Sequence, residues 1–575
     1  MYILKLEDHF KLPIHYVSTK TELKPNVIAD LELVETLDAS GSGTPLYQST
    51  FMPTTEPGKI ILKQIPKYYT TDVSFLKDTQ TLLKTYRTNA EQPQADFVKM
   101  LELWNEMKND TGFKDKYHYI DWAYWEHLNH SETFLQIMSM YSLASPFLSM
   151  LVPLIILIVP FFVIKSKGLD ISMKEYIEVL KVIASNHAIG KLCTNFNSVP
   201  FDQKMYLLLS SGFYLFSIYQ NFLTCARFYK NMKHIHTSLC GVREYITRTL
   251  DGMTTLLVHT APLQSYALFN ENIRANMAVL KEYQSKLENI QGDKFTFRNI
   301  QQIGQLLKYF YEMYVSEEYN ACFSHSFGFH GYIENLNGLM TNIKDKKLAF
   351  ATYQKKKKTI FKKAYYAALI HEKSIKNTIK LDKNLIITGP NASGKTTTLK
   401  TALINVILTQ QFGCGYYKSA NLNPYQYVHC YLNIPDTSGR DSLFQAEARR
   451  CKEIIDIIKE NIEDRHFCVF DELYSGTNPD EAVMSANAFM EYLVKFKNVK
   501  CILTTHFIAV CKKLNKHPQI ENYHMETKES GDTFNYTYLL KKGISEVRGG
   551  IKVLHDMQYP KEIIENSKFQ GGKNE

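Results

Sequence analysis

The stretch that decides the fold is Thr388-Gly-Pro-Asn-Ala-Ser-Gly-Lys-Thr-Thr397. A glycine, four further residues and then Gly-Lys-Thr form the pattern of a phosphate-binding loop, in which glycines let successive backbone N–H groups curl around phosphate oxygens. Residues 385–387 before the loop predict a buried strand. Residues 397–408 after it predict a helix whose positive N-terminal end points at the phosphates. Since strand, loop and helix are all in place, the stretch predicts a nucleotide site rather than an ordinary turn.

The loop contains the groups that bind phosphate and a metal ion. Lys395 is expected to reach the β- and γ-phosphates, and the Thr396 hydroxyl is expected to hold Mg²⁺. The cofactors that the loop predicts are therefore ATP and Mg²⁺. The residues predicted to bind the nucleotide are Gly389, Pro390, Asn391, Ala392, Ser393, Gly394, Lys395, Thr396 and Thr397.

Two apolar strands further along the chain supply candidates for hydrolysis. The first ends in Asp471, predicted to bind Mg²⁺ through water, and Glu472, predicted to position or deprotonate the attacking water. The second ends in Thr-Thr-His506, where a histidine can contact the γ-phosphate and sense hydrolysis. A lone histidine is more often structural, but its place at the tip of such a strand favours a switch. Lys395, Glu472 and His506 are the predicted catalytic residues of an ATPase.

Length and composition set the class of protein. The chain has 575 residues, of which 45% are hydrophobic and only 18 are Pro and 26 Gly, so long disordered regions are not expected. Such a length fits about two to four domains. The net charge of +9 permits an anionic partner without requiring one. The ten cysteines lack metal-site spacing and no signal sequence begins the chain, so an intracellular protein, cytoplasmic or nuclear and not secreted, is expected.

The region before the loop is predicted to be mostly helical. Residues 1–45 are expected to form a small N-terminal element, and residues 46–370 an α-helical core or lever domain. Within it, the pattern over 117–140 predicts a helix rich in aromatic residues. Its aromatic stripe, which includes Trp122 and Trp125, is expected to lie in the core.

Two apolar stretches interrupt the helical pattern. Residues 145–164 and 205–226 carry no charged side chain, and about 20 such residues are enough to cross a bilayer. In the first, Pro146, Pro153 and Pro160 would kink a helix, which membrane helices tolerate better than soluble ones. A membrane hairpin and a pair of buried core helices both remain open.

Several motifs together resemble the MutS mismatch-repair ATPases. They are Thr388-Gly-Pro-Asn391 with Gly394-Lys-Thr396, Ser442-Leu-Phe-Gln-Ala-Glu447, Asp471-Glu-Leu-Tyr-Ser-Gly-Thr477 and Thr504-Thr-His506. The resemblance implies an α/β P-loop NTPase of the ABC type over residues 371–545, followed by a C-terminal helical tail over 546–575. It also implies a dimer in which Ser442 reaches the partner's nucleotide in trans and Thr477 lies at the dimer seam.

A weaker resemblance extends towards the N-terminus. Leu31-Glu-Leu33 and Pro45-Leu-Tyr47 are similar to the start of the helical core domain of the family. The chain then has no room for the family's N-terminal mismatch-reading and connector domains, and no Phe-x-Glu wedge lies near its start. A short, divergent MutS-like protein without the mismatch-reading domain is therefore expected.

Two functions remain open on the sequence. In the first, the chain is a DNA-dependent ATPase of the MutS family. It binds and hydrolyses ATP as a dimer to drive a DNA-binding clamp in mismatch repair or recombination control. In the second, a membrane-anchored mechanochemical ATPase of MutS-like fold, attached through residues 145–226, works without mismatch recognition. The expected partners are a second copy of the chain or another MutS-like chain, duplex or branched DNA and, for the second function, a membrane. A MutL-like partner is left open.

Overall fold

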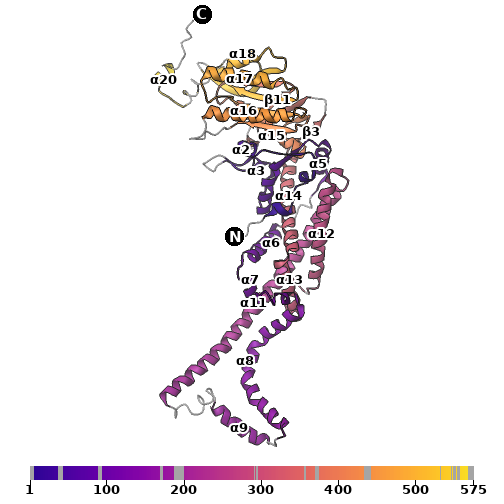
Figure 1. Ribbon diagram of the computed structural model, residues 1–575, viewed down its shortest axis with the longest axis vertical. Helices are drawn as coiled ribbons and strands as arrows, with labels where there is room; N and C mark the ends of the chain where they lie inside the picture. Colours follow the sequence, from indigo (N-terminus) through magenta and orange to yellow (C-terminus); the bar gives the residue numbers. More distant parts are fainter. Residues whose placement is uncertain are drawn as a thin grey trace. The chain divides into compact units, whose positions relative to one another are not determined.

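The computed structural model describes residues 5–36, 43–87, 94–168, 172–186, 200–290, 292, 295–354, 358–369, 374–432, 442–530, 533–545, 547, 552, 554 and 557–566. The chain divides into two compact units, whose elements Figure 1 labels. The first consists of Met1–Leu4, Glu91–Asp251 and Met277–Phe323, and the second of Lys5–Ala90, Gly252–Asn276 and Ser324–Glu575. The domain boundaries expected at residues 45, 370 and 545 stay predictions.

The described part of the first unit is helical. Its elements are α6 (Gln94–Asn109), α7 (Phe113–Lys116), α8 (Glu132–Ser166), α9 (Met173–Asn186) and α13 (Ile303–Val315), with parts of α11 (Phe201–Thr260), α12 (Ala267–Glu288) and α14 (Glu317–Lys344). The base of α8 packs closely on α13, because a Cβ atom at Gly304 would lie 2.3 Å from the Glu132 carbonyl oxygen. The Gly304 N–H also donates to the side-chain oxygen of Gln136 at 2.8 Å. Only glycine allows this approach, so Gly304 fixes the base of α8.

The helix predicted over residues 117–140 is wrong in its first half. The Asn129 side chain accepts from the Ile120 N–H at 2.9 Å and donates to the Ile120 carbonyl at 2.8 Å, which closes a loop where the helix was expected. A 3₁₀ turn follows, and α8 begins only at Glu132, with Ser131 as its N-cap. Trp122 and Trp125 are 71% and 43% exposed, so they do not belong to the core.

The first apolar stretch lies in α8 and the second in α11. Within α8, Glu132–Leu151 is long and apolar enough to cross a membrane by length and composition. No second helix among the described residues meets that test.

The second unit contains a six-stranded sheet in the order β13-β12-β6-β11-β10-β9. Its strands are β6 (Asn384–Thr388), β9 (Tyr427–Tyr431), β10 (His466–Asp471), β11 (Val499–Thr505), β12 (Ile520–Ser530) and β13 (Thr533–Lys542). All neighbours pair in parallel except β12 and β13, which form an antiparallel hairpin at one edge. β6, β10 and β11 are almost wholly buried, as a parallel sheet covered on both faces requires.

A second, five-stranded sheet has the order β5-β4-β8-β3-β7. Its strands are β3 (Ala349–Tyr353), β4 (Thr359–Ala364), β5 (Asn377–Leu381), β7 (Cys414–Gly415) and β8 (Ser419–Leu422). Helix α15 (Lys395–Phe412) contacts strands of both sheets, and nearly all of its side chains are buried. The strand and helix predicted around the loop are thus confirmed. The order of elements is a mostly helical region followed by α/β sheets.

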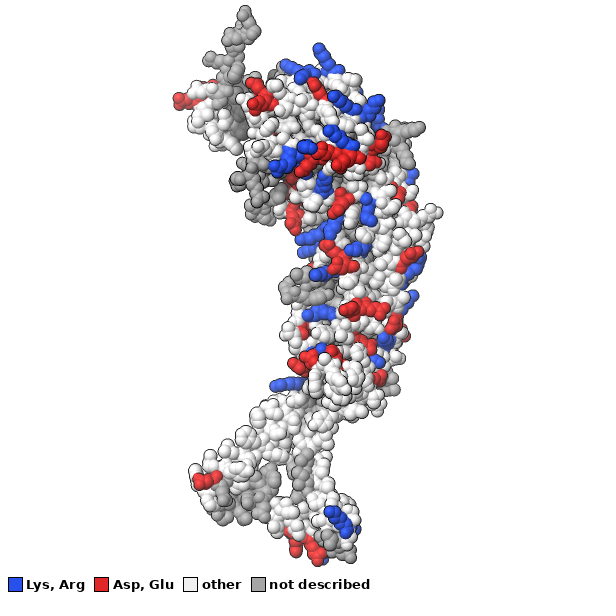
Figure 2. Space-filling model, viewed as in Figure 1, with Lys and Arg blue, Asp and Glu red and all other residues white. Residues whose placement is uncertain are grey.

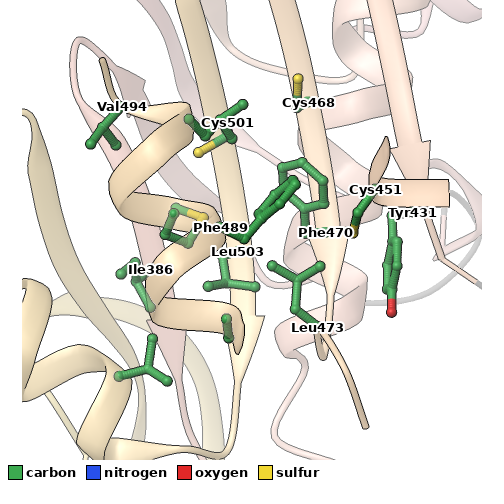
Figure 3. Close-up of a cluster of buried hydrophobic side chains, with 14 of the residues drawn as sticks. Ile386, Tyr431, Cys451, Cys468, Phe470, Leu473, Phe489, Val494, Cys501 and Leu503 are labelled. Atoms are coloured by element: carbon green, nitrogen blue, oxygen red, sulfur yellow. The ribbon is translucent and has the colours of Figure 1, made fainter. Parts of the chain in front are cut away.

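The main core of the α/β region lies between the six-stranded sheet and α16 (Leu443–Glu460), α17 (Pro479–Leu493) and α18 (Ile508–Leu514). Phe470 of β10 and Phe489 of α17 meet edge to face with ring centroids 5.3 Å apart. Figure 3 shows them beside Leu473 and Leu503. This packing fixes the ends of β10 and β11, where the predicted catalytic residues stand.

The second unit also contains the rest of α11, α12 and α14 and several short elements. The short elements are α1 (Leu6–His9), α2 (Pro25–Asp30), α3 (Leu46–Phe51), α4 (Glu56–Gln64) and α5 (Val73–Thr85), the strand pair β1 (Lys20–Glu22) and β2 (Tyr68–Thr70), and α20 (Lys561–Asn566). Of the predicted C-terminal tail, α20 is the described helix, and the other residues of that prediction lie largely outside the described ones.

Candidate nucleotide-binding site

The predicted phosphate loop joins β6 to α15. Gly394 stands just before the first helical residue with φ +94°, a conformation that glycine adopts without strain. A Cβ atom there would also lie 3.2 Å from the ring of Tyr538. The first N–H groups of an α-helix have no partner within the helix, so the N-terminus of α15 offers donors to an anion held by the loop.

Lys395 projects from the first turn of α15 into a buried position. Its side chain is 5% exposed, and its Nζ donates to the Pro390 carbonyl at 3.2 Å. The same atom lies 3.9 Å from Glu472 Oε1. Burial lowers the pKa of Lys395, while the charges of Glu472 and Asp471 act to raise it. The loop thus holds a cation beside the helix N-terminus, where it can meet a phosphate.

Thr396 and Asp471 come together at the carboxyl edge of the sheet. The Thr396 hydroxyl donates to Asp471 Oδ2 at 2.9 Å, and the Thr504 hydroxyl donates to Asp471 Oδ1. Asp471 and Thr504 are register partners in β10 and β11, so the sheet itself sets their contact. A hydroxyl beside a carboxylate is a donor set that suits Mg²⁺, which completes its shell with water and phosphate oxygens. Thr396 and Asp471 therefore fit the ion that the sequence predicts.

Glu472 and His506 form the closest pair in the site. His506 Nε2 lies 2.6 Å from Glu472 Oε1 and 3.2 Å from Lys395 Nζ. One nitrogen cannot donate to Glu472 and accept from Lys395 at once, so the shorter contact decides that Nε2 donates to Glu472. This hydrogen bond is the main cause that lowers the pKa of Glu472, and the charges of His506 and Lys395 add to it against the effect of burial. The carboxylate of Glu472 is therefore ionised at neutral pH and able to accept a proton.

Glu472 also has an unusual backbone. Its φ is +52°, in the left-handed region that a side chain normally avoids. The Glu472 N–H donates to the Thr504 carbonyl at 3.0 Å, which holds the strained residue at the end of the sheet. Strain of this kind costs about 1–3 kcal/mol and is often found where a functional side chain must be aimed.

A cavity of about 620 Å³ opens in front of the loop. Residues 391–397 and Glu472 line one side of it. Much of the remaining lining is apolar and aromatic, a composition that suits a flat ring rather than a phosphate. Its residues include Tyr365, Tyr366, Leu369, Ile375, Ile379, Met525 and Tyr538.

Sequence reasoning missed this aromatic wall. Its residues come from several segments with no common spacing, and the one signal available was the segment around Ile375 that resembles the family's approach to the loop.

Ser442 lies apart from the loop of its own chain. It is the N-cap of α16, where its hydroxyl accepts from the Gln445 N–H at 3.3 Å and its own N–H donates to Gln445 Oε1 at 2.9 Å. It is not among the residues that line the 620 Å³ cavity. A role for Ser442 at a partner's nucleotide stays a prediction, and so does the place of Thr477, whose hydroxyl donates to Glu481 at 2.7 Å.

Glu447 has a positioning role that the sequence did not indicate. Its carboxylate is buried and accepts from the Ser475 N–H at 3.1 Å, from the Ser475 hydroxyl at 3.0 Å and from the Gly476 N–H at 3.2 Å. These bonds tie α16 to the turn that follows Glu472. The motif that contains Glu447 was visible, but its target is not local in sequence.

The sequence of this region is similar to that of a known protein family. Residues 385–571 match the MutS domain V family. The C-terminal region of this chain is similar to MutS domain V. This confirms the resemblance to MutS that the motifs indicated.

Individual relatives agree with the family match. MutS protein homolog 4 of Homo sapiens is 31% identical over 192 residues, which are 32% of this chain and 20% of that protein. DNA mismatch repair protein MutS of Chlamydia abortus is 28% identical over 197 residues, or 33% of this chain and 23% of that protein. The matched part of the chain thus spans about a fifth of the length of these curated relatives.

Proposed function

We propose that this chain binds and hydrolyses ATP through its MutS domain V, and that a dimer uses the cycle to drive a DNA-binding clamp in mismatch repair or recombination control. The observation that carries the proposal is the convergence of Lys395, Glu472 and His506 in front of the helix N-terminus, with Glu472 within 4 Å of both other residues. In a parallel sheet, the carboxyl edge is where ligands bind.

The residues have distinct roles in this proposal. The loop N–H groups and Lys395 hold the phosphates and stabilise the charge that develops on them. Glu472, kept ionised by His506, orients the attacking water and accepts its proton. His506 responds to the presence of the γ-phosphate by keeping or breaking its hydrogen bond to Glu472. Thr396 and Asp471 would hold Mg²⁺, which neutralises phosphate charge when it is bound.

The dimer supplies the remaining group. Ser442 stands exposed at the N-terminus of α16, where an anion is favoured by the helix dipole. A partner's nucleotide would accept from its hydroxyl and from the first N–H groups of α16. The partner is a second copy of this chain or another MutS-like chain, and duplex or branched DNA is the substrate of the clamp. The protein acts inside the cell, in the cytoplasm or the nucleus.

One experiment tests the function as a whole. The ATPase rate of the full chain is measured alone and with homoduplex, mismatched and branched DNA, in buffer with and without detergent. A rate that rises with DNA, and less so as salt increases, supports the clamp. No ATP turnover under any of these conditions would contradict the proposal. An ATPase that is indifferent to all three DNAs would favour the alternative of a membrane-anchored ATPase without mismatch recognition, which the relatives' names do not favour.

A further inference from the structure

Helices α8 and α11 of the first unit run in opposite directions; they lie close together near the rest of the unit and diverge towards their other end (Figure 1). The Cys225 thiol points to the Leu143 carbonyl at 3.5 Å, and the Tyr214 hydroxyl donates to the Ser149 carbonyl at 3.3 Å. The residue number rises along α8 as it falls along α11, so the two helices form an antiparallel hairpin. Its arms are defined here as residues 143–164 and 205–226.

The outer surface of both arms is apolar. On α8, Phe147 and Phe162 are 71% and 63% exposed, and on α11, Phe213 and Phe222 are 71% and 63% exposed. At 3.6 residues per turn, the exposed apolar positions of each arm cover roughly 200° of the helix circumference. A helix on the surface of a soluble protein turns its apolar stripe towards the core, so the arms have the opposite arrangement.

Half of the Ser, Thr, Asn and Gln side chains in the α11 arm are turned inwards. Ser210, Ser211 and Asn221 are half-buried, on the same side of α11 as Tyr214 and Cys225, which contact α8. Ser217, Gln220 and Thr224 are exposed. Helices that pack within lipid place small and polar residues between them and apolar residues outside.

The arms have the length of a bilayer. Neither contains a charged residue, and each has about 22 residues, or about 33 Å of helix, against about 30 Å of hydrocarbon core. On the face that Figure 2 shows, this part of the hairpin is white, and coloured charges lie beyond its ends. Away from its ends and from prolines, an α-helix pairs its backbone groups within itself, which a membrane-crossing segment requires.

Both ends of the hairpin have residues that suit a membrane surface. Tyr141 and Tyr229 are 61% and 43% exposed at the end near the rest of the unit, and Tyr206 is 69% exposed at the other end. Arg227 directly follows one arm, and Lys165 directly follows the other. Tyrosine rings prefer the boundary between hydrocarbon and water, and Lys and Arg mark the ends of spans.

We infer that α8 and α11 insert into a lipid bilayer as a hairpin and attach this ATPase to a membrane. A second copy of the chain would cover the apolar surface of the arms less completely than a bilayer. One helix–helix interface covers only a stripe and leaves most of a surface of roughly 200° exposed. A hairpin crosses twice, so the segments before α8 and after α11 lie on the same side of the bilayer. This inference does not depend on the proposed DNA clamp and is compatible with it.

The test begins with the full chain in cells. Membranes are collected, treated with nuclease and then extracted with alkaline carbonate. The protein is expected to stay in the membrane pellet. Ile155→Arg with Phe216→Arg places a charge at the middle of each arm and is expected to lower the pellet fraction at least about tenfold. The matched control, Val258→Arg with Leu268→Arg, alters two equally exposed apolar residues outside the arms and is expected to leave the fraction unchanged.

A second measurement keeps the inference testable if the Arg variant fails to fold, which loss of binding to a fluorescent ATP analogue would reveal. The wild-type chain is reconstituted into sealed vesicles of phosphatidylcholine and phosphatidylglycerol and digested with trypsin from outside. A protected fragment that contains both arms supports insertion, and complete digestion overturns it. Release by carbonate, or by nuclease alone, also overturns it. So does a protein that is soluble without detergent and whose arms cross-link to those of a second copy.

Discussion

Replacing Glu472 by Gln removes one negative charge from the site while keeping the size of the side chain. The amide oxygen of Gln can still accept from His506 Nε2, which lies 2.6 Å from Glu472 Oε1 in the wild type. ATP affinity is expected to be retained, because the charge that is lost lies 3.9 Å from Lys395 and competes with phosphate for it. The change therefore separates chemistry from binding.

The expected loss of rate follows from the role of the carboxylate. A positioned general base contributes about 10²- to 10⁴-fold to a rate, so the hydrolysis barrier should rise by about 3–5 kcal/mol. The assay is single-turnover release of phosphate, with binding of a fluorescent ATP analogue measured in parallel. Mass measurement in solution with ATP should show the variant held as a dimer.

The control for this prediction is Glu491→Gln. Glu491 pairs with Lys513 at 3.7 Å on the surface, away from the loop, so its variant should hydrolyse ATP at the wild-type rate. Hydrolysis by Glu472→Gln at close to the wild-type rate would refute the assignment of the base. Loss of ATP binding together with turnover would instead indicate that Glu472 holds the loop in shape.

The remaining predictions concern the groups around Glu472. Lys395→Ala should weaken ATP binding about 10- to 100-fold, the worth of a charge-assisted hydrogen bond, while Lys452→Ala on the surface should not, and equal affinities in a titration would contradict this. His506→Ala should raise the pKa of Glu472 from its lowered value, so that the acid limb of the pH–rate profile moves to higher pH; a limb that stays in place would exclude His506 as the cause. The lowered pKa of Glu472 also affects folding stability. It stabilises the fold at pH values above the ordinary glutamate pKa of 4.5, and that contribution is lost as the pH falls through the lowered pKa. Ser442→Ala should cost about 1 kcal/mol of stability through the lost N-cap and should slow turnover only where dimers form, whereas Ser442→Thr should retain both properties; a monomer that hydrolyses ATP at the full rate would rule out the trans role.

The phosphate side of the site could be predicted because its signals are local. Loop, strand and helix follow one another within residues 384–412, and the ends of β10 and β11 are each defined by an apolar run that stops at a polar residue. Parallel strands bring such ends to one edge, so Asp471, Glu472 and His506 had to meet there.

The base side of the cavity and the start of α8 could not be predicted for the opposite reason. Tyr365 and Tyr538 both line the cavity although more than a hundred residues separate them, and no spacing in the sequence encodes this. The helix pattern over residues 117–140 failed because two hydrogen bonds of Asn129 to Ile120 close a loop, and a periodicity count does not register them. The inward side of α11 is likewise a property of its pairing with α8 rather than of its composition.

The left-handed backbone conformation of Glu472 is unfavourable for folding stability, whereas its side chain is needed for activity. Glycine at this position would relieve the unfavourable φ of +52°, worth about 1–2 kcal/mol. It would also remove the carboxylate that accepts from His506 Nε2 at 2.6 Å. The two effects oppose each other, so Glu472→Gly should melt close to the wild-type temperature and yet be inert as an ATPase. A selection for thermal stability alone would not reject such a change, so a screen of this chain that does not also select for turnover would be expected to recover well-folded proteins that do not hydrolyse ATP.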